Sequence, residues 1–430
     1  MTPALNSILI RGGHVIDPAA NLDGDADVLL RDGRVAEVGR RLAAKVEQTL
    51  DARNLIVAPG FIDLHVHLRE PGQTHKETIA SGTAAAAAGG FTTVCAMPNT
   101  APINDSPEVT AWMRHSARGA VVNVFPIAAV TRGSAGEQLT DFAALHRAGA
   151  VAFTDDGKPV LDEQLMREAL QHAHRLGVPV IQHAEDTAMT AGATMNAGPT
   201  SFRLGLRGML PEAESSVVER DIELARRTGA HLHVAHLSTA AALKAVRRAK
   251  KEKTHVTCEV TPHHFTLLDS DISDAYDSRF KMNPPLRNGA DREALLAGLA
   301  DGAIDAIATD HAPHASHEKN VEWERAPFGI IGLETALPLA ITRLHRGHDI
   351  SLRRIVELLA ANPARIIGLR GRGTLAAGSH ADVVLFDPKK RWTYDASRSA
   401  SRSRNTPFDG WQFFGQVVAT VVSGRIVYRS

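Results

Sequence analysis

The chain has 430 residues, 44% of them hydrophobic, which is enough to bury a large core in one big domain or two. Lysine plus arginine and aspartate plus glutamate both total 48, so no overall basic field for nucleic acid and no acidic tail is present. No run of eighteen apolar residues suits a membrane span, and the N-terminal MTPALNSILIRGG lacks the basic and apolar regions of a signal peptide. Cys95 and Cys258 lie in apolar runs typical of reduced core thiols, so we expect a cytoplasmic protein.

The two ends of the chain share one pattern. Residues 7–57 and 381–430 alternate apolar and polar side chains around glycine and aspartate, which predicts antiparallel strands. Neither end alone makes a convincing core. We therefore expect one small β-sandwich built from both termini, residues 1–57 and 369–430, with a second domain between them over residues 58–368.

In that middle part, short apolar runs alternate with helical segments, a rhythm that predicts parallel strands covered by helices. Eight runs are candidate strands: 61–67, 91–97, 121–128, 149–154, 178–183, 231–236, 255–260 and 304–309. The clearest candidate helices are 76–90, 161–177, 238–251, 334–346 and an appended segment 352–369. Eight parallel strands are the number that a closed barrel needs, so we predict an α/β fold with a TIM-type (β/α)8 barrel.

Near the C-terminus, residues 398–410 (RSASRSRNTPFDG) are basic and of low complexity. A nucleic-acid-binding tail would have such a composition. The stretch is short, has little aromatic interleaving and has apolar strands on both sides, which favours a loop.

The segment GFIDLHVHLREPG, residues 60–72, places His65 and His67 two positions apart on a predicted strand. Side chains at that spacing point to the same face, so the two imidazoles could share one metal ion. A solvated pair on an amphipathic strand is the alternative, and it is the commoner explanation for an isolated pair.

Other metal-binding side chains follow the predicted strands at the same end. In barrel enzymes the chemistry takes place at the carboxyl ends of the strands. There the sequence has four histidines and three aspartates: His65, His67, Asp155, Asp156, His183, His236 and Asp310. Imidazole with carboxylate suits Zn²⁺, for which Mn²⁺ or Co²⁺ could substitute. The set is large enough for two metals, and a hydroxide held between them would be a strong nucleophile at neutral pH.

Two carboxylates in this set have candidate roles of their own. A bridge between two metals needs a carboxylate or its equivalent, and Asp156 is preferred, with Asp155 as the competitor. Asp310 could bind a metal and also take the proton from the attacking water, because a carboxylate beside a cation stays ionised until a proton arrives.

The remaining histidines near the strand ends are assigned by strand parity. In HLHVAH, His236 shares a face with the apolar residues, so His231 and His233 should point the other way, toward the helices, as structural residues. His263 and His264 follow the seventh run and could lie near the site, although ordinary loop polar residues are the favoured interpretation.

With these residues in view, the chain closely resembles the class I dihydroorotases of the amidohydrolase superfamily. Those enzymes interconvert N-carbamoyl-L-aspartate and L-dihydroorotate in pyrimidine biosynthesis. The matching segments run nearly end to end: HVHLREPG, GGFTTVCAMPNT, FTDDG, HAED, HVAHLST, EVTPHH, KMNPPLR, ATDHAPH and APFGIIGLETALP.

The resemblance implies a role for each matching residue. His65 and His67 would bind one zinc, His183 and His236 the second, and Asp156 would bridge them. Asp310 would bind the first zinc and act as the catalytic acid and base. The substrate contacts that the resemblance implies are Arg69, Asn99, Asn283, His314 and the backbone of Phe328 and Gly329.

The resemblance also has limits. Many relatives carry a carboxylated lysine at the fourth strand, whereas here the region reads VAFTDDGKPV and Lys158 lies past a glycine. The absence of that lysine agrees with class I dihydroorotases, which are described with one or two metals. The resemblance also implies a homodimer. Association with aspartate transcarbamoylase is compatible with the sequence.

The alternatives to a dihydroorotase are another cyclic amidohydrolase (dihydropyrimidinase, hydantoinase or allantoinase) and a non-catalytic dihydroorotase-like scaffold of aspartate transcarbamoylase. Residues 314–329 are long enough to close over the site.

Overall fold

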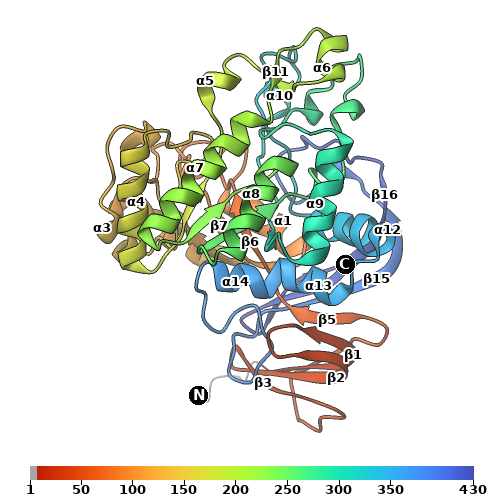
Figure 1. The fold of residues 1–430 in the computed structure, drawn as a ribbon. Helices are drawn as coiled ribbons and strands as arrows, with labels where there is room; N and C mark the ends of the chain where they lie inside the picture. Colours follow the sequence, from red (N-terminus) through yellow and green to blue (C-terminus); the bar gives the residue numbers. More distant parts are fainter. Residues whose placement is uncertain (1–6) are drawn as a thin grey trace.

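A computed structural model describes residues 7–430. The sequence predicts no signal peptide in the N-terminal segment, of which residues 1–6 lie outside the described part. Helices surround a set of short parallel strands, and a separate sheet lies at one end of the molecule (Figure 1). Between residues 7 and 430, no helix combines the length and the apolar character that a membrane crossing requires.

The separate sheet, called the terminal sheet below, joins the two ends of the chain. Its strands are β1 (Ser7–Asp17), β2 (Leu22–Arg31), β3 (Arg34–Gly39), β4 (Gln48–Asp51), β5 (Ile56–Pro59), β15 (Val383–Thr393), β16 (Gln412–Val422) and β17 (Arg425–Arg429). The order is β17-β16-β15-β5-β1-β2-β3, with β4 paired to β1. Antiparallel pairing of β5 with β15 connects the N-terminal strands to the C-terminal strands, with Val57 opposite Leu385. Both of these side chains belong to one buried cluster, so the core of this sheet depends on both ends.

The parallel strands form two further sheets. One contains β6 (Phe61–Val66), β7 (Phe91–Ala96) and β8 (Asn123–Pro126); the other contains β9 (Val180–Gln182), β12 (Leu232–Val234), β13 (Val256–Val260) and β14 (Ala306–Ile307). Isolated parallel bridges connect these sheets: Phe153 pairs with Ala128 and with Val180, and His311 pairs with Val66.

The fourth predicted strand, 149–154, is shorter than the sequence indicates. Gly149 caps the preceding helix α3 (Phe142–Ala148) with φ 115°, and the Ala150 N–H still donates to the Leu145 carbonyl. At the other end, the Asp155 side chain turns toward Thr131. Only the residues between these two constraints remain extended, and Phe153 alone forms bridges there.

Helices cover the parallel strands. They are α1 (Ile79–Ala88), α2 (Pro107–Ser116), α4 (Glu163–Leu176), α7 (Glu212–Thr228), α8 (Ala240–Lys251) and α9 (Gly289–Asp301). Of these, α1, α4 and α8 lie within candidate helices predicted from the sequence. Local capping explains their ends: the Asp162 side chain accepts a hydrogen bond from the Leu165 N–H at the start of α4, and Gly177 ends that helix with φ 70°. The segment 334–346 is helical from α11 (Ala336–Leu339) to α12 (Arg346–His348), and 352–369 contains α13 (Leu352–Val356) and α14 (Asn362–Ile366).

Two excursions extend the end of the molecule away from the terminal sheet (Figure 1). After β9 the chain forms α5 (Thr187–Thr190), β10 (Met195–Asn196), α6 (Pro199–Leu204) and β11 (Gly208–Met209). After β14 it forms α10 (Ser316–Lys319) within the segment 314–329. The carboxyl ends of the parallel strands lead into these excursions, so this is the end at which a site can form.

Candidate metal centre and substrate pocket

The carboxyl ends of the parallel strands surround a cavity of about 330 Å³. All six predicted substrate contacts line it: Arg69, Asn99, Asn283, His314, Phe328 and Gly329. So do five of the six predicted metal ligands: His67, Asp156, His183, His236 and Asp310. The sixth, His65, is fully buried directly beneath this cluster, 3.2 Å from Asp156. The structure thus brings together the six preferred metal ligands and the six substrate contacts, whereas Asp155, the other candidate, does not line the cavity.

Asp156 lies at the centre of the histidines. Its Oδ1 atom is 3.2 Å from His65 Nε2 and 3.8 Å from both His183 Nδ1 and His236 Nε2. Its Oδ2 atom is 3.5 Å from His67 Nε2. Two groups able to hold a metal ion therefore share this carboxylate: His65 with His67, and His183 with His236.

The two other aspartates of the region lie differently. Asp310 Oδ1 is 3.1 Å from His67 Nε2 and 3.5 Å from His65 Nε2, so Asp310 faces the first histidine pair. Asp155 points away, because its carboxylate accepts hydrogen bonds from the backbone N–H and the hydroxyl of Thr131. The geometry therefore separates Asp156, which faces the histidines, from its competitor Asp155.

The side chains fit a divalent metal ion. The Nε2 atom of His65 is fully buried and has no hydrogen-bond partner among the described residues, although carboxylate oxygens lie nearby. A buried polar atom without a partner is costly, whereas a metal ligand needs a free lone pair in this position. Imidazoles combined with carboxylates suit divalent transition metals.

The charges of the cluster depend on one another. Burial lowers the pKa of His65, but the carboxylates of Asp156 and Asp310 outweigh it and raise this pKa well above its usual value. Burial raises the pKa of Asp156 and of Asp310, but the charge of His65 outweighs it and holds both below the normal range. A metal ion would replace the histidine protons as the positive partner of these carboxylates, so its binding must release protons.

Glu259 on β13 orients a histidine of the cluster, and the sequence analysis passed over it. Its Oε1 atom lies 3.1 Å from His65 Nδ1 and its Oε2 atom 3.1 Å from His233 Nε2. Burial raises the pKa of Glu259, but the hydrogen bonds with the two histidines outweigh it and lower this pKa to about 2. A carboxylate on the far nitrogen of a ligand fixes its tautomer and orientation. The only sequence signal was an acidic residue inside the apolar run HVTCEV, residues 255–260.

The predicted direction of His231 and His233 is wrong. Leu232 and Val234 pack with the helices, in the same buried cluster as residues of α8, so His233 between them faces the interior. His231 lies on the same side as His233, since both contact the Thr257 hydroxyl. His233 reaches Glu259 there, and burial lowers the pKa of His231 to about 3 beside its neighbour on the next strand. Parity failed because β12 ends at Val234 and His236 adopts a left-handed φ of 30°, so its side chain no longer follows the strand alternation.

His263 and His264 do not line the cavity. His264 hydrogen-bonds the Thr261 hydroxyl and the Pro284 carbonyl, as the favoured interpretation expects of a loop residue. His263 is buried beside it and belongs to neither metal-binding group.

Glu185, from the HAED motif, holds both a metal-type histidine and a predicted substrate contact. Its Oε2 atom is 3.0 Å from His183 Nε2, which leaves His183 Nδ1 facing Asp156. The same carboxylate oxygen accepts a hydrogen bond of 2.7 Å from Asn283 Nδ2. Glu185 therefore connects the second histidine pair to the lining of the pocket.

Asn99 also belongs to both parts of the site. Its Oδ1 atom is 2.8 Å from His67 Nδ1, and its Nδ2 atom donates a 3.4 Å hydrogen bond to Asp156 Oδ2. The side chain lines the cavity at the same time. Asn99 thus orients the metal-type residues from the substrate side.

Arg69 brings an unmatched positive charge into the pocket. It is only 8% exposed, and its Nε atom donates to the Pro313 carbonyl at 3.1 Å. No carboxylate in residues 7–430 lies within 4.0 Å of its guanidinium nitrogens. Burial lowers the pKa of Arg69 to about 10, so the side chain still carries its charge at neutral pH. The carboxylates of Asp310 and Asp156 act on Arg69 only over a longer distance, so the donors of its guanidinium are open to an anionic ligand.

His314 and Gly329 form the wall beside Arg69. His314 Nε2 lies 2.9 Å from the Phe328 carbonyl and 3.4 Å from Arg69 Nη2. Burial, together with the charge of Arg69, lowers the pKa of His314 to about 2, so the imidazole is neutral. Gly329 has φ 121°, and a Cβ atom there would lie 2.7 Å from the Cβ of Ala312, so only glycine fits.

Two buried lysines, which the sequence analysis did not single out, fix the backbone of this wall. Lys281 Nζ donates to the carbonyls of Trp323, Glu324 and Ala326. Lys319 Nζ donates to the carbonyls of Pro327 and Gly329, at 2.8 and 3.2 Å. Burial lowers the pKa of Lys281 to about 8 and that of Lys319 to about 7.

Comparison with known proteins identifies the family of this chain. The family model "Dihydro-orotase-like" matches residues 54–242. A dihydroorotase from Solibacter usitatus (strain Ellin6076) is 52% identical over 420 residues, which cover 97% of both chains. A dihydroorotase from Geobacter sp. (strain M21) is 49% identical over 426 residues, which cover 99% of this chain and 100% of the relative.

Solved structures share the fold. The L-hydantoinase (dihydropyrimidinase) from Arthrobacter aurescens superposes with a TM-score of 0.88 at 25% identity and covers 98% of this chain and 96% of its own. The dihydropyrimidinase from Brevibacillus agri NCHU1002 gives a TM-score of 0.86 at 26% identity, covering 98% and 95%. The near full-length identity of about one residue in two to the dihydroorotases is the more specific match. The chain is therefore an enzyme that belongs to the dihydroorotase family.

Proposed function

We propose that this enzyme interconverts N-carbamoyl-L-aspartate and L-dihydroorotate in pyrimidine (UMP) biosynthesis, with one or two zinc ions in the metal centre. The carrying observation is the buried Arg69 guanidinium, which has no carboxylate partner and faces the same cavity as the histidines and Asp156. Both compounds carry a carboxylate that such an arginine can bind, next to the amide group that reacts.

The zinc ligands are assigned as follows. His65 and His67 would hold one zinc, His183 and His236 the second, and Asp156 would lie between them as the shared ligand, with Asp310 on the first zinc. When bound, zinc would activate a water molecule and polarise the amide carbonyl. The histidine-rich set with carboxylates is the combination that zinc prefers.

Asp310 is proposed as the acid and base. In hydrolysis, the water oxygen bonds to the ring amide carbon, the bond from that carbon to the ring nitrogen breaks, and Asp310 moves the water proton to the leaving nitrogen. In ring closure the same carboxyl group supplies the proton with which water leaves. Its Oδ1 atom, 3.1 Å from His67 Nε2, faces the cavity in which the reacting amide would lie.

The substrate carboxylate is proposed to lie against Arg69. A guanidinium can donate two parallel hydrogen bonds to a carboxylate and so fix its orientation. Asn99, Asn283, His314 and the backbone of residues 328–329 would complete the pocket. With its carboxylate at Arg69 and its amide carbonyl at the zinc, the substrate would be oriented so that the ring amide lies beside Asp310.

The finer architecture and the partners are part of the proposal. The bridges at Phe153 and His311 support a closed eight-stranded (β/α)8 barrel over residues 58–368. The small β-sandwich of residues 1–57 and 369–430 stays a prediction, since the described strands of both ends pair in one sheet. The free, buried thiols of Cys95 and Cys258 suit the reducing cytoplasm. The homodimer and the association with aspartate transcarbamoylase stay predictions.

A substrate panel tests the reaction. Purified enzyme is assayed in the ultraviolet with L-dihydroorotate and with hydantoin, and the zinc content of the same preparation is determined by elemental analysis. We expect hydrolysis of L-dihydroorotate with one to two zinc ions per chain. Turnover of hydantoin alone would favour another cyclic amidohydrolase, and bound zinc without turnover of either compound would favour a scaffold.

Arg69 variants test the assigned carboxylate site. Arg69→Ala should raise the KM for N-carbamoyl-L-aspartate by about a hundredfold, since a charge-assisted bidentate contact is lost. Arg69→Lys keeps the charge without the fork and should lie between the two. An unchanged KM in folded Arg69→Ala would remove Arg69 from the substrate site.

A further inference from the structure

The segment 399–406, within the stretch of low complexity predicted as a loop, buries most of its polar side chains against the site, while Ala400 and Arg402 stay exposed. It leaves the terminal sheet after β15, and Ser401, Ser403, Asn405 and Thr406 are each at most 4% exposed. Buried polar side chains must find hydrogen-bond partners, so the contacts of this segment reveal what it holds.

Asn405 uses its whole side-chain amide to join two parts of the substrate pocket. Its Nδ2 atom donates to the carbonyls of Ala312 and Gly329, both at 3.0 Å. Its Oδ1 atom accepts from the His314 N–H at 3.1 Å. Its backbone carbonyl accepts from the Ile331 N–H at 3.0 Å.

These partners are lining residues, whereas Asn405 is not. Ala312, His314 and Gly329 all face the cavity, and Asn405 lies behind them. Arg69 is tied to the same backbone, because its Nε atom donates to the Pro313 carbonyl. Ala312 and Ile330 are also joined directly, because the Ala312 N–H donates to the Ile330 carbonyl at 2.8 Å. Asn405 adds three side-chain hydrogen bonds to this single link and so restrains the distance between the 312–314 backbone, on which Arg69 rests, and Gly329.

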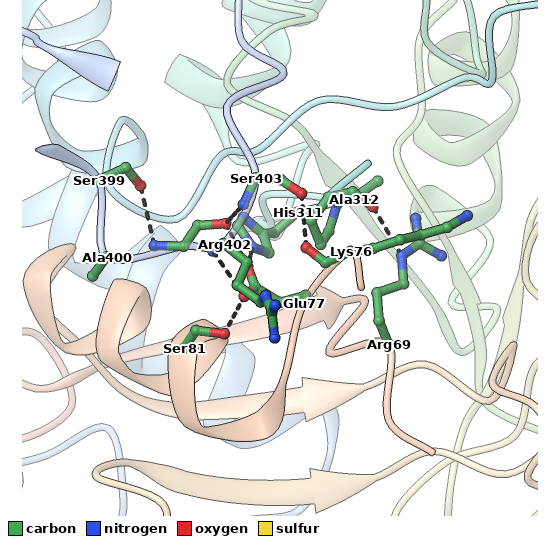
Figure 2. A network of polar contacts seen from close by, with 12 residues as sticks. Arg69, Lys76, Glu77, Ser81, His311, Ala312, Ser399, Ala400, Arg402 and Ser403 are labelled. Atoms are coloured by element: carbon green, nitrogen blue, oxygen red, sulfur yellow. Dashed lines mark hydrogen bonds and ion pairs between the residues drawn. The ribbon is translucent and has the colours of Figure 1, made fainter. Parts of the chain in front are cut away.

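The segment that carries Asn405 is itself anchored, in part through Glu77 (Figure 2). Glu77 is fully buried just before α1 and accepts hydrogen bonds from the Ser401 hydroxyl and from the Arg402 N–H, the latter at 3.0 Å. Its carboxylate also lies 3.3 Å from His311 Nε2. The Ser403 hydroxyl donates to the Lys76 carbonyl at 2.7 Å.

The anchor therefore reaches both parts of the site. His311 directly follows Asp310, and its carbonyl accepts from the His67 N–H at 2.9 Å. Through Glu77 the C-terminal segment is fixed to the backbone that carries the metal-type residues, and through Asn405 it holds the substrate side.

We infer that Asn405 is a positioning residue for substrate binding: it holds the backbone of residues 312–314 and Gly329 at the spacing that lets Arg69 and its neighbours bind the substrate carboxylate. This inference rests on the proposed function. It assigns a role in the pocket to a residue from the C-terminal part of the chain, which contributes no cavity-lining side chain.

Asn405→Asp tests the inference, because the carboxylate keeps the acceptor for the His314 N–H and loses both N–H donors. We expect the KM for L-dihydroorotate to rise by about tenfold or more, with kcat within about threefold and zinc content unchanged. Ser403→Ala removes one anchor of the segment outside the pocket and should raise the KM by about twofold to threefold, again with kcat and zinc content unchanged. This variant tests the inference if Asn405→Asp does not fold.

Asn362→Asp is the matched control. Asn362 is also a buried asparagine whose Nδ2 atom donates to a backbone carbonyl, that of Asp305, but it does not line or contact the pocket. Its KM should equal that of the wild type. An equal KM increase in both variants would assign the effect to general loosening of the fold and would overturn the inference, as would an unchanged KM in folded Asn405→Asp and Ser403→Ala.

A double-mutant cycle gives a second reading. If Asn405 acts through the wall beside Arg69, Asn405→Asp should raise KM much less in the Arg69→Ala background than in the wild type. Fully additive effects would contradict the inference. Wild-type turnover of L-dihydroorotate in the same assay tests the proposed function separately, so a failure of that proposal is distinguishable from a failure of the role of Asn405.

Discussion

The two sides of the cavity are built in different ways. The metal centre (His65, His67, Asp156, His183, His236 and Asp310) lies on or directly after parallel strands. The opposite side, here called the substrate wall (Arg69, His314, Phe328 and Gly329), consists largely of loop backbone. Side chains hold the metal centre, through Glu259, Glu185 and Asn99. Side chains also hold the substrate wall, but by donating to its backbone carbonyls: Lys319 does so from within the segment 314–329, and Asn405 from the distant C-terminal part of the chain.

The difference indicates which perturbation each side tolerates. A metal centre on strand ends inherits its geometry from the sheet, so changing one supporting side chain should alter affinity while the fold persists. A wall made of loop backbone has no such frame and depends on each donor that satisfies its carbonyls. Changes to the metal centre should therefore act on turnover and metal content, and changes behind the substrate wall on KM and stability.

Asp310→Asn should give the largest effect. The amide keeps the size of the side chain but cannot accept the proton, so kcat should fall on the order of 10²-fold to 10⁴-fold. Turnover of L-dihydroorotate is measured at saturating zinc, beside thermal unfolding of both proteins. Near-normal turnover in the folded variant would show that Asp310 is not the acid and base. The metal centre would then no longer be the side of the cavity that determines turnover.

Glu259→Gln should give the next effect, on metal affinity. The carboxylate that fixes His65 Nδ1 becomes a neutral amide, which should weaken zinc binding by about tenfold to a hundredfold. Zinc retention is measured by competition with a chelator. Glu214→Gln is the control, since Glu214 is an equally buried carboxylate that accepts from Ser238 and Thr239 and touches no metal-type residue. Equal zinc loss in both variants would contradict the orienting role.

The metal centre was the part of the molecule that the sequence predicted best. His65 and His67 lie at the end of one predicted strand and Asp310 directly follows another, both with a clear apolar pattern, so their convergence follows from the order of parallel strands. The terminal sheet was predicted as well, because apolar and polar side chains alternate at both ends of the chain, which is typical of strands. Glu259, Lys281 and Lys319 were missed, because a single polar residue in an apolar or loop segment has no periodic signal.

Parity failed for His233 because it assumed that the strand continues to His236, where the backbone turns left-handed. Asn405 was missed because a basic segment of low complexity gives no sign of burial. Its partners at residues 312–314 and 329 are brought to it only by the complete fold.

Lys319→Met should give the smallest effect, and on stability rather than chemistry. Burial lowers the native pKa of Lys319 to about 7, below that of an unfolded lysine near 10.4, so between these values the unfolded chain binds more protons. The lysine therefore makes the free energy of unfolding increase with pH across this window, by at most about 1.4 kcal/mol per pH unit. Denaturant unfolding at pH 7, 8 and 9 should show a smaller increase in the free energy of unfolding for Lys319→Met than for the wild type.

Lys244→Met is the control, because Lys244 lies on the exposed side of α8, and this variant should keep the wild-type dependence on pH. Parallel profiles for all three proteins would mean that Lys319 binds its proton equally well in the folded and the unfolded chain. Lys319 would then hold the substrate wall as a charged ammonium group, and the wall would resemble the metal centre in depending on buried charge.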